Sequence, residues 1–311
     1  MFDLVFLGTA AAVPSADRGL PALYVGHGPD RFLVDCGEGT QRQLLCAGLG
    51  FRGLSRVLLT HAHLDHIAGL AGLVATRALW GLDDAIEITG SAETIAFVRY
   101  YLAVTVGTER DDRYRLRAVE PGVVIARPGW RLDAFAVAHR GTQSLGWRFS
   151  EDARIPLLTE RLAGLGVPEG AMRRELAAGR AVTLDNGRVV APEMVQGPKI
   201  AGTRLVVIGD VEEVASLTQQ VGASDALVIE ATFLDRDAAL ARSRGHLTAA
   251  SAAWLAREAG VGELLLTHIS GRYRPEEIAA EAAAIFPHTR VVADLDRVAV
   301  TARSRPAGIA A

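Results

Sequence analysis

The chain alternates short apolar runs with alanine-rich segments, and this alternation restricts its fold more than any other feature. The apolar runs are typical of β-strands, and most of them end at Gly, Asp, Glu or His. They cover 4–7, 31–34, 57–60, 85–89, 133–138, 204–208, 226–229, 263–267 and 290–292. Helical spacing of apolar residues predicts helices over 40–47, 67–80, 92–105, 248–259 and 275–285. Strands and helices in alternation predict a layered α/β fold.

Composition permits a large buried core and excludes several protein classes. Half of the 311 residues are hydrophobic and 22% are charged, which excludes a disordered chain, and two cysteines exclude a disulfide scaffold. There are 36 acidic and 33 basic residues, so a nucleic-acid ligand would need a local basic surface. The N-terminus carries Asp3 where an export signal carries Lys or Arg, and the apolar stretch 67–82 is short and interrupted by Arg77. We therefore expect a cytoplasmic protein with no membrane partner.

Residues 151–203 interrupt the strand and helix pattern. Gly and Pro punctuate this stretch, which holds one helix-like piece at 171–178 and a turn signal at Asp185-Asn186-Gly187. We predict that it leaves the core of the fold.

The densest chemical signal is His61-Ala62-His63-Leu64-Asp65-His66, with four metal-ligand residues in six positions. The motif follows a strand and precedes a helix. On such a turn His61 and His63 can face one cation while Asp65 and His66 face a second. Imidazole and carboxylate groups are ligands that Zn²⁺ and similar divalent ions accept.

Other apolar runs end in further ligand types, namely His139, Asp210 and His268. The run Leu58-Leu59-Thr60-His61 also recurs as Leu265-Leu266-Thr267-His268, which two similar half-sheets would explain. We predict two metal sites that share Asp210. The first ion would bind His61, His63, His139 and Asp210, and the second would bind Asp65, His66, Asp210 and His268. Two cations lower the pKa of a bridging water and polarise a phosphoryl or carbonyl oxygen, so the set predicts metal-assisted hydrolysis, with Asp65 orienting the water or accepting its proton.

A second pair of residues would protonate the leaving group. Glu230 ends the strand at 226–229, and His246 precedes the helix that starts near 248. A glutamate that holds a histidine imidazolium makes it a general acid with a fixed tautomer. Taken separately, the glutamate would cap a turn and the histidine would only precede a helix, so this pattern leaves both roles open.

Further motifs surround the candidate ligands. They are Phe6-Leu7-Gly8-Thr9, Asp35-Cys36-Gly37-Glu38-Gly39-Thr40-Gln41-Arg42-Gln43-Leu44, Ser144-Leu145-Gly146, Glu230-Ala231-Thr232-Phe233, Gly245-His246 and Thr267-His268-Ile269-Ser270-Gly271-Arg272-Tyr273. With these motifs the sequence, from Phe2 to about Asp294, resembles the ribonuclease Z family, which processes tRNA 3′ ends and belongs to the metallo-β-lactamase-fold superfamily. The ligand order alone would also suit a thioesterase or a lactonase.

This resemblance implies an αββα sandwich with two zinc ions, or manganese or another divalent ion in their place, and a homodimer. It also implies an inserted arm at about 151–203 that grips the tRNA elbow. From the sequence itself we predict one domain over 1–302 and a frayed tail at 303–311.

The implied activity is a zinc-dependent endoribonuclease, a phosphodiesterase that removes the 3′ trailer of precursor tRNA by metal-hydroxide attack and leaves a tRNA 3′-hydroxyl. The resemblance makes Asp65, Glu230 and His246 the catalytic residues and gives Arg272 and Ser270 a role in substrate binding. The alternative is a small-molecule phosphodiesterase, thioesterase or lactonase on the same dinuclear site. A metal-stabilised binding protein without activity is a third interpretation.

Overall fold

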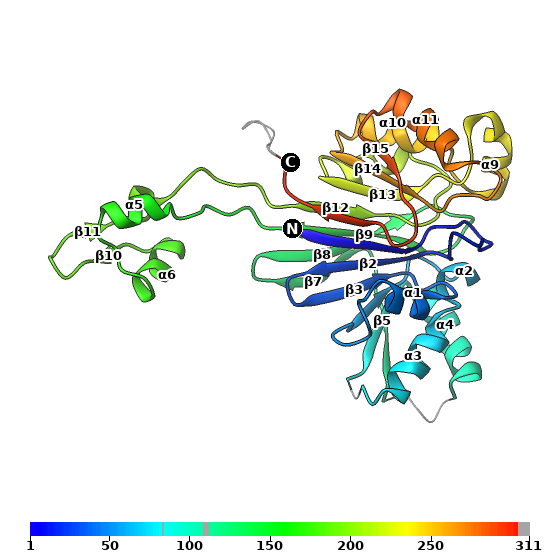
Figure 1. Ribbon diagram of the computed structural model, residues 1–311, viewed down its shortest axis with the longest axis horizontal. Coiled ribbons are helices and arrows are strands. Elements are labelled where there is room, and N and C mark those ends of the chain that lie inside the picture. Colours follow the sequence, from blue (N-terminus) through cyan, green and yellow to red (C-terminus); the bar gives the residue numbers. More distant parts are fainter. Residues whose placement is uncertain (83, 108–111, 304–311) are drawn as a thin grey trace. The chain divides into compact units, whose positions relative to one another are not determined.

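A computed structural model describes residues 1–82, 84–107 and 112–303 of the chain (Figure 1). It divides into two compact units, one formed by Met1–Ser150 and Thr203–Thr301 and the other containing Glu151–Gly202. Most of the predicted tail, 304–311, lies outside the described residues. None of the helices in the described ranges is long and apolar enough to cross a membrane.

Two seven-stranded sheets form the centre of the larger unit. The first sheet has the order β16 (Arg297–Val300), β1 (Phe2–Gly8), β2 (Ala22–His27), β3 (Asp30–Val34), β4 (Arg56–Leu58), β5 (Ile86–Gly90) and β6 (Tyr114–Ala118). The second has the order β15 (Thr289–Val291), β14 (Glu263–Thr267), β13 (Ala226–Glu230), β12 (Arg204–Val207), β9 (Ser144–Glu151), β8 (Trp130–Val137) and β7 (Gly122–Arg127).

Each sheet contains a parallel block whose strands share one direction. In the first sheet β3, β4, β5 and β6 run parallel, and in the second β12, β13, β14 and β15 do so. The repeated Leu-Leu-Thr-His sequence falls at the ends of β4 and β14, one in each sheet. The carboxyl ends of parallel strands meet at one edge of a sheet, so each block delivers the residues that follow its strands to one place.

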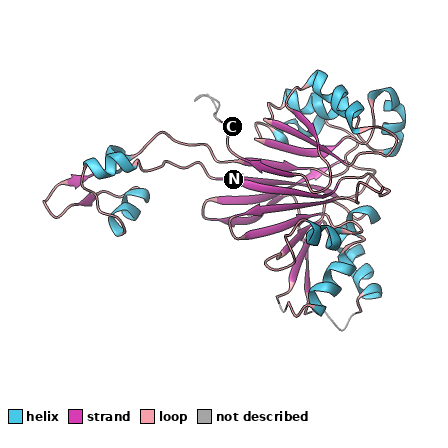
Figure 2. Ribbon diagram, viewed as in Figure 1, coloured by secondary structure: helices cyan, strands magenta, loops and turns pink. Residues whose placement is uncertain are grey.

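Helices cover the outer face of each sheet (Figure 2). The first sheet packs against α1 (Thr40–Cys46), α3 (Leu70–Leu79) and α4 (Ala92–Thr105). The second sheet packs against η2 (Ala215–Leu217), α8 (Thr218–Val221), α9 (Ala238–Arg244), α10 (Ala249–Glu258) and α11 (Pro275–Ile285). A third apolar core lies between the sheets and includes Phe32, Trp147 and Phe149. These layers confirm the predicted αββα sandwich.

The predicted helix over 67–80 was wrong in one respect, because the chain forms two helices there. Helix α2 (Leu64–Ile67) ends before Gly69, and α3 begins at Leu70. The Gly69 amide donates to the Cys36 carbonyl oxygen at 2.8 Å, and a Cβ at this position would meet the Gly37 carbonyl oxygen at 2.1 Å. The close approach of the 36–37 turn thus separates the helices and holds α2 beside the end of β3.

The sequence patterns also missed several elements, of which α9 lies nearest to the predicted site residues. This helix is short and has one buried residue, Ala241, so it shows no apolar periodicity. Between α9 and the preceding strand lies η3 (Asp235–Asp237).

The smaller unit has a core of its own. It contains α5 (Thr159–Gly164), α6 (Ala171–Ala177), the hairpin of β10 (Val182–Thr183) and β11 (Val189–Val190), and α7 (Pro192–Val195). Leu162, Leu176 and Val195 are among the buried residues that pack together in it. The predicted turn at Asp185-Asn186-Gly187 connects the two hairpin strands, with Gly187 at φ +82°.

Candidate metal centre

The His61–His66 motif lies between β4 and α2. The chain stays extended up to His63, with φ −63° and ψ 147°, and turns helical at Leu64. His61 and His63 therefore project from extended backbone, whereas Asp65 and His66 project from one helical turn. The rings of His61 and His66 are fully buried, and their centroids lie 4.2 Å apart.

Three residues from the second sheet complete the cluster. His139 follows β8, Asp210 follows β12 and His268 follows β14, and all three are buried. His268 has φ +55°, a conformation uncommon outside glycine, which turns the chain sharply at the end of the strand. The structure therefore brings together all seven predicted ligand residues, contributed by both sheets.

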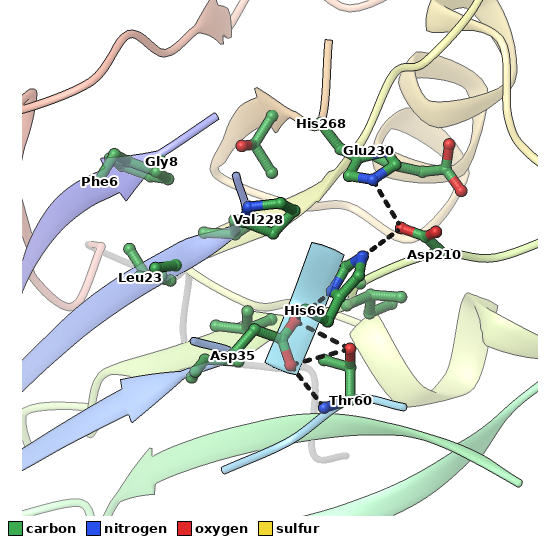
Figure 3. Close-up of a pocket in the computed structure, with 17 residues that line it drawn as sticks. Phe6, Gly8, Leu23, Asp35, Thr60, His66, Asp210, Val228, Glu230 and His268 are labelled. Carbon is green, nitrogen blue, oxygen red and sulfur yellow. Dashed lines mark hydrogen bonds and ion pairs between the residues drawn. The ribbon is translucent and has the colours of Figure 1, made fainter. Parts of the chain in front are cut away.

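Asp210 lies at the centre, and its two carboxylate oxygens face different groups of ligands. Oδ2 lies 3.8 Å from Nε2 of both His61 and His139, and the latter atom lies 3.3 Å from Nδ1 of His63. Oδ1 lies 3.3 Å from His66 Nε2 and 3.2 Å from His268 Nε2 (Figure 3). Asp65 Oδ2 joins this second group, 3.4 Å from His268 Nε2. The two groups correspond to the two predicted ligand sets.

The ligand atoms fit a metal ion because the protein alone leaves them unsatisfied. Among the described residues, His61 Nε2, His66 Nε2 and Asp210 Oδ1 are fully buried and make no hydrogen bond. Buried polar atoms without partners are rare because they have lost hydration without replacement. Histidine nitrogens and carboxylate oxygens that converge in this way are suited to zinc and related divalent ions. The His/Asp cluster is therefore able to bind metal.

The pKa values of the cluster residues bear on how a cation would bind. Burial would lower the pKa of His66, but Asp210 and Asp35 hold it well above its usual range, so a cation at this ring would displace a proton. Burial lowers the pKa of His61, His63 and His139, so these rings stay neutral. Burial would raise the pKa of Asp210, but the surrounding histidines hold it well below its usual range. Burial would likewise raise the pKa of Asp65, but its hydrogen bond with His268 and the charges of His66 and His268 together lower it, so Asp65 stays ionised. Neutral imidazole and ionised carboxylate are the forms that coordinate metals.

Four of these histidines have the other ring nitrogen, Nδ1, held by a hydrogen bond. His66 Nδ1 bonds to Asp35 Oδ2 at 2.8 Å, and His61 Nδ1 bonds to Thr60 Oγ1 at 3.0 Å. His139 Nδ1 bonds to the Gly245 carbonyl oxygen at 2.9 Å, and His268 Nδ1 bonds to Thr232 Oγ1 at 2.9 Å. Such partners fix the tautomer and direct Nε2 toward the centre.

Asp35 is a functional residue that the sequence analysis did not assign. It is buried at the end of β3 and also accepts hydrogen bonds from the Thr60 amide at 2.8 Å and the Thr60 hydroxyl at 2.9 Å (Figure 3). Because Thr60 contacts His61 and Asp35 contacts His66, this one pair positions two ligands. An acidic residue directly after a strand was the available signal.

Glu230 and His246 lie together beside the cluster. Glu230 is fully buried, and its oxygens accept hydrogen bonds from the Val211 amide, the Thr232 hydroxyl and the Leu247 amide. Both oxygens lie 3.1 Å from His246 Nδ1, which is itself 3.8 Å from Asp210 Oδ2. Burial opposes a charge on His246, but its hydrogen bond to Glu230 and the negative charges of Glu230 and Asp210 together raise its pKa to about 8.

Comparisons with known proteins assign the family. Ribonuclease Z of Bradyrhizobium diazoefficiens is 53% identical over 301 residues, which covers 96% of this chain and the full length of that protein. Ribonuclease Z of Archaeoglobus fulgidus is 33% identical over 305 residues, covering 97% of this chain and 98% of that protein. The chain belongs to the ribonuclease Z family. The resemblance inferred from the motifs is thus confirmed.

Three further matches concern part of the chain or the fold of this ribonuclease Z family member. A family model described as "Anti-Pycsar protein Apyc1" matches residues 2–140. The solved structure of human tRNase Z, short form, has a TM-score of 0.67 at 23% identity, and the match covers 96% of this chain and 99% of that one. The metallo-β-lactamase fold protein YhfI from Bacillus subtilis has a TM-score of 0.69 at 19% identity, and the match covers 96% of this chain and 98% of that one. These structures confirm the predicted fold class.

Ser270 and Arg272 follow the predicted ligand His268 in this ribonuclease Z family member. Ser270 is half-buried, and its hydroxyl accepts a hydrogen bond from the Arg272 amide at 3.3 Å. The Arg272 side chain is exposed and forms no ion pair with any residue that the structure describes. The structure therefore places both residues in the turn after the predicted ligand His268.

Proposed function

We propose that this chain removes the 3′ trailer from tRNA precursors as a metal-dependent endoribonuclease and leaves a 3′-hydroxyl on the tRNA. One observation carries the proposal. The carboxylate of Asp210 is shared by two groups of ligand atoms, and the Glu230–His246 pair lies directly beside it. Hydrolysis of a phosphodiester needs both parts, because charge on the phosphate must be stabilised and the departing oxygen must gain a proton.

Two zinc ions are the proposed cofactor, with manganese or another divalent ion as the alternative. His61, His63, His139 and Asp210 would hold the first, and Asp65, His66, Asp210 and His268 would hold the second. When bound, such ions lower the pKa of the attacking water and neutralise the charge on the phosphate. Metal analysis of protein purified without added metal would identify the ion and count it.

The residues around the cluster supply the proton transfers. The water oxygen attacks phosphorus and gives up a proton to Asp65, which passes it to solvent. The bond from phosphorus to the ribose 3′-oxygen of the tRNA breaks, and this oxygen takes a proton from Nε2 of His246. Nδ1 of that ring is bound to Glu230, so the ring orientation is fixed before the substrate arrives. The trailer departs with a 5′-phosphate.

Residues 151–203 would act as the arm that binds the tRNA, within a single domain covering 1–302. Arg174, Arg188 and Lys199 support this proposal, because they are exposed and form no ion pairs within the described parts of the chain. Free cations of this kind suit phosphate groups, and a chain with a net charge of −3 needs them locally. Ser270 and Arg272, in the turn after His268, would contact the phosphate nearer the cleaved bond.

A homodimer is proposed as the assembled form, in the cytoplasm where the tRNA substrate would be met. Helix α4 supports association, because Phe97, Tyr100 and Val104 lie on one side of it and are 50%, 77% and 86% exposed. Burial of such a stripe against a second copy would remove apolar surface from water. Light scattering would then give a mass of two chains for the wild type and of one chain for Tyr100→Arg.

Single-turnover cleavage of an unprocessed tRNA precursor by the zinc-loaded protein tests the function, with bis-p-nitrophenyl phosphate as a small substrate. A matched variant replaces 151–203 by a short Gly-Ser linker, which the antiparallel pairing of Ser150 with Arg204 would close. We expect cleavage at one site, lost in the variant while hydrolysis of the small ester persists. Turnover of the ester without cleavage of the precursor would contradict the proposal and favour a small-molecule phosphodiesterase.

A further inference from the structure

A cavity of about 330 Å³ lies next to His246 and is lined by no residue of the predicted ligand sets. Its walls come from the loop that follows Asp210, from η3 and α9, and from the start of α10. The lining residues are Glu212, Glu213, Val214, Ala215, Asp235, Ala238, Ala241, Arg242, His246, Leu247, Thr248 and Ser251. This volume falls within the range of small-molecule sites.

The chemistry of the proposed cleavage, on which this inference rests, indicates which part of the substrate lies at this cavity. A product with a free 3′-hydroxyl means that the departing atom is the ribose 3′-oxygen of the last nucleotide kept on the tRNA. His246 must come within hydrogen-bond distance of this oxygen to protonate it. The nucleoside that carries the oxygen therefore lies on the His246 side of the metal centre, where the cavity is. The attacking water approaches from the opposite side, as in-line displacement requires.

The lining has the chemistry of a nucleotide site. Val214, Ala215 and Ala238 give part of the wall an apolar surface, against which the face of a base can pack. Glu212 keeps one carboxylate oxygen beyond the one that accepts the Arg140 amide at 2.7 Å, and this oxygen can accept an N–H group from the edge of a base.

Arg242 adds a positive charge at the same cavity. Its side chain is exposed in the last turn of α9 and forms no ion pair with the residues in the described ranges. An unpaired guanidinium is suited to a phosphate group. We propose that this cavity binds the last nucleotide retained on the tRNA, with its base against the apolar wall and its 5′-phosphate at Arg242.

Filling the cavity tests the placement of the base. Ala238→Trp would occupy it, and Ala239→Trp is the matched control, because Ala239 is exposed on the same helix and does not line the cavity. We expect Ala238→Trp to lower kcat/KM for the precursor about 20-fold, the typical effect of losing the stacking of one base. Hydrolysis of bis-p-nitrophenyl phosphate, which has no nucleotide to place, should fall less than precursor cleavage does in Ala238→Trp and should stay within about twofold in Ala239→Trp.

A thermodynamic cycle that removes the charge of the phosphate, of Arg242 or of both tests the phosphate contact independently. Precursor with a neutral methylphosphonate on the 5′ side of the last retained nucleotide should lose about tenfold in kcat/KM with the wild-type protein. Arg242→Gln should lose about tenfold on the natural precursor and nothing further on the neutral one. Arg244→Gln, on the same helix but outside the cavity lining, should still respond to the neutral linkage as the wild type does.

The outcomes separate this inference from the proposed function. Equal precursor cleavage by the two tryptophan variants, or equal sensitivity of wild type and Arg242→Gln to the neutral linkage, would overturn the nucleotide site alone. Ester hydrolysis without any precursor cleavage by the wild type would overturn the proposed function and the nucleotide site with it. If Ala238→Trp loses both activities it has misfolded, and the Arg242 cycle then decides.

Discussion

Replacing Asp35 by Asn should weaken metal binding without disturbing the fold. Asp35 has φ +60°, a region that Asn adopts nearly as readily as Asp, so the backbone is preserved. The amide oxygen can still accept from the Thr60 amide, as Oδ1 does at 2.8 Å. The amide nitrogen would then replace Oδ2, which accepts from His66 Nδ1 at 2.8 Å. This nitrogen donates, so the His66 ring must carry its proton on Nε2, the atom that faces Asp210.

The magnitude follows from the hydrogen bond between His66 Nδ1 and the charged Asp35 carboxylate, which the variant cannot form when His66 binds metal through Nε2. A hydrogen bond to a charged group contributes about 1.5–3 kcal/mol, and 1.4 kcal/mol corresponds to tenfold in affinity. Zinc affinity should therefore fall about 10- to 150-fold in Asp35→Asn, in line with the 10- to 100-fold typical of residues that support metal ligands.

Competition with a chromophoric zinc chelator measures this affinity, and thermal unfolding of the metal-free protein checks the fold. Asp133→Asn is the matched control, because Asp133 is buried in β8 and pairs with Arg131 and Arg148, away from the ligands. Wild-type zinc affinity in Asp35→Asn would refute the reasoning that this carboxylate sets the tautomer of His66.

Three further predictions concern stability and thiol chemistry. Arg77→Met should lower the free energy of unfolding by about 2–4 kcal/mol in urea titrations, because the buried guanidinium donates to three backbone carbonyl oxygens at 2.8–3.0 Å; a change below about 0.5 kcal/mol would contradict this. Gly146→Ala should lower the free energy of unfolding by about 1–3 kcal/mol, because its Cβ would lie 2.3 Å from a phenylalanine ring. Gly164→Ala in α5, where nothing lies near the new Cβ, should raise it by about 0.5 kcal/mol. Equal effects of the two substitutions would rule out the steric explanation. Iodoacetamide at pH 8 should label the exposed Cys46 alone, because burial raises the pKa of Cys36 to about 12, and mass spectrometry showing label on Cys36 in folded protein would oppose that.

Sequence patterns were most informative where structure is set by neighbouring residues. The helices expected over 92–105 and 275–285 match α4 and α11, because Ser91 caps the first and Pro275 begins the second. The strand over 263–267 matches β14 for a similar reason, since an apolar run ends where polar residues begin. The local pattern gave a wrong prediction over 67–80, because contact with the distant 36–37 turn separates two helices there.

The sequence by itself determined which chemistry this protein can perform, because ligand types concentrated in six residues and at strand ends leave few alternatives to metal-assisted hydrolysis. Only the tertiary structure decided how those ligands are held. Asp35 reaches His66 across 31 positions of sequence, and Thr232 reaches His268 across 36. Such hydrogen bonds depend on the pairing of parallel strands and on the direction of each side chain, and neither leaves a periodic signal in the chain. The same holds for the cavity beside His246, whose walls meet only because α9 and α10 pack on the second sheet.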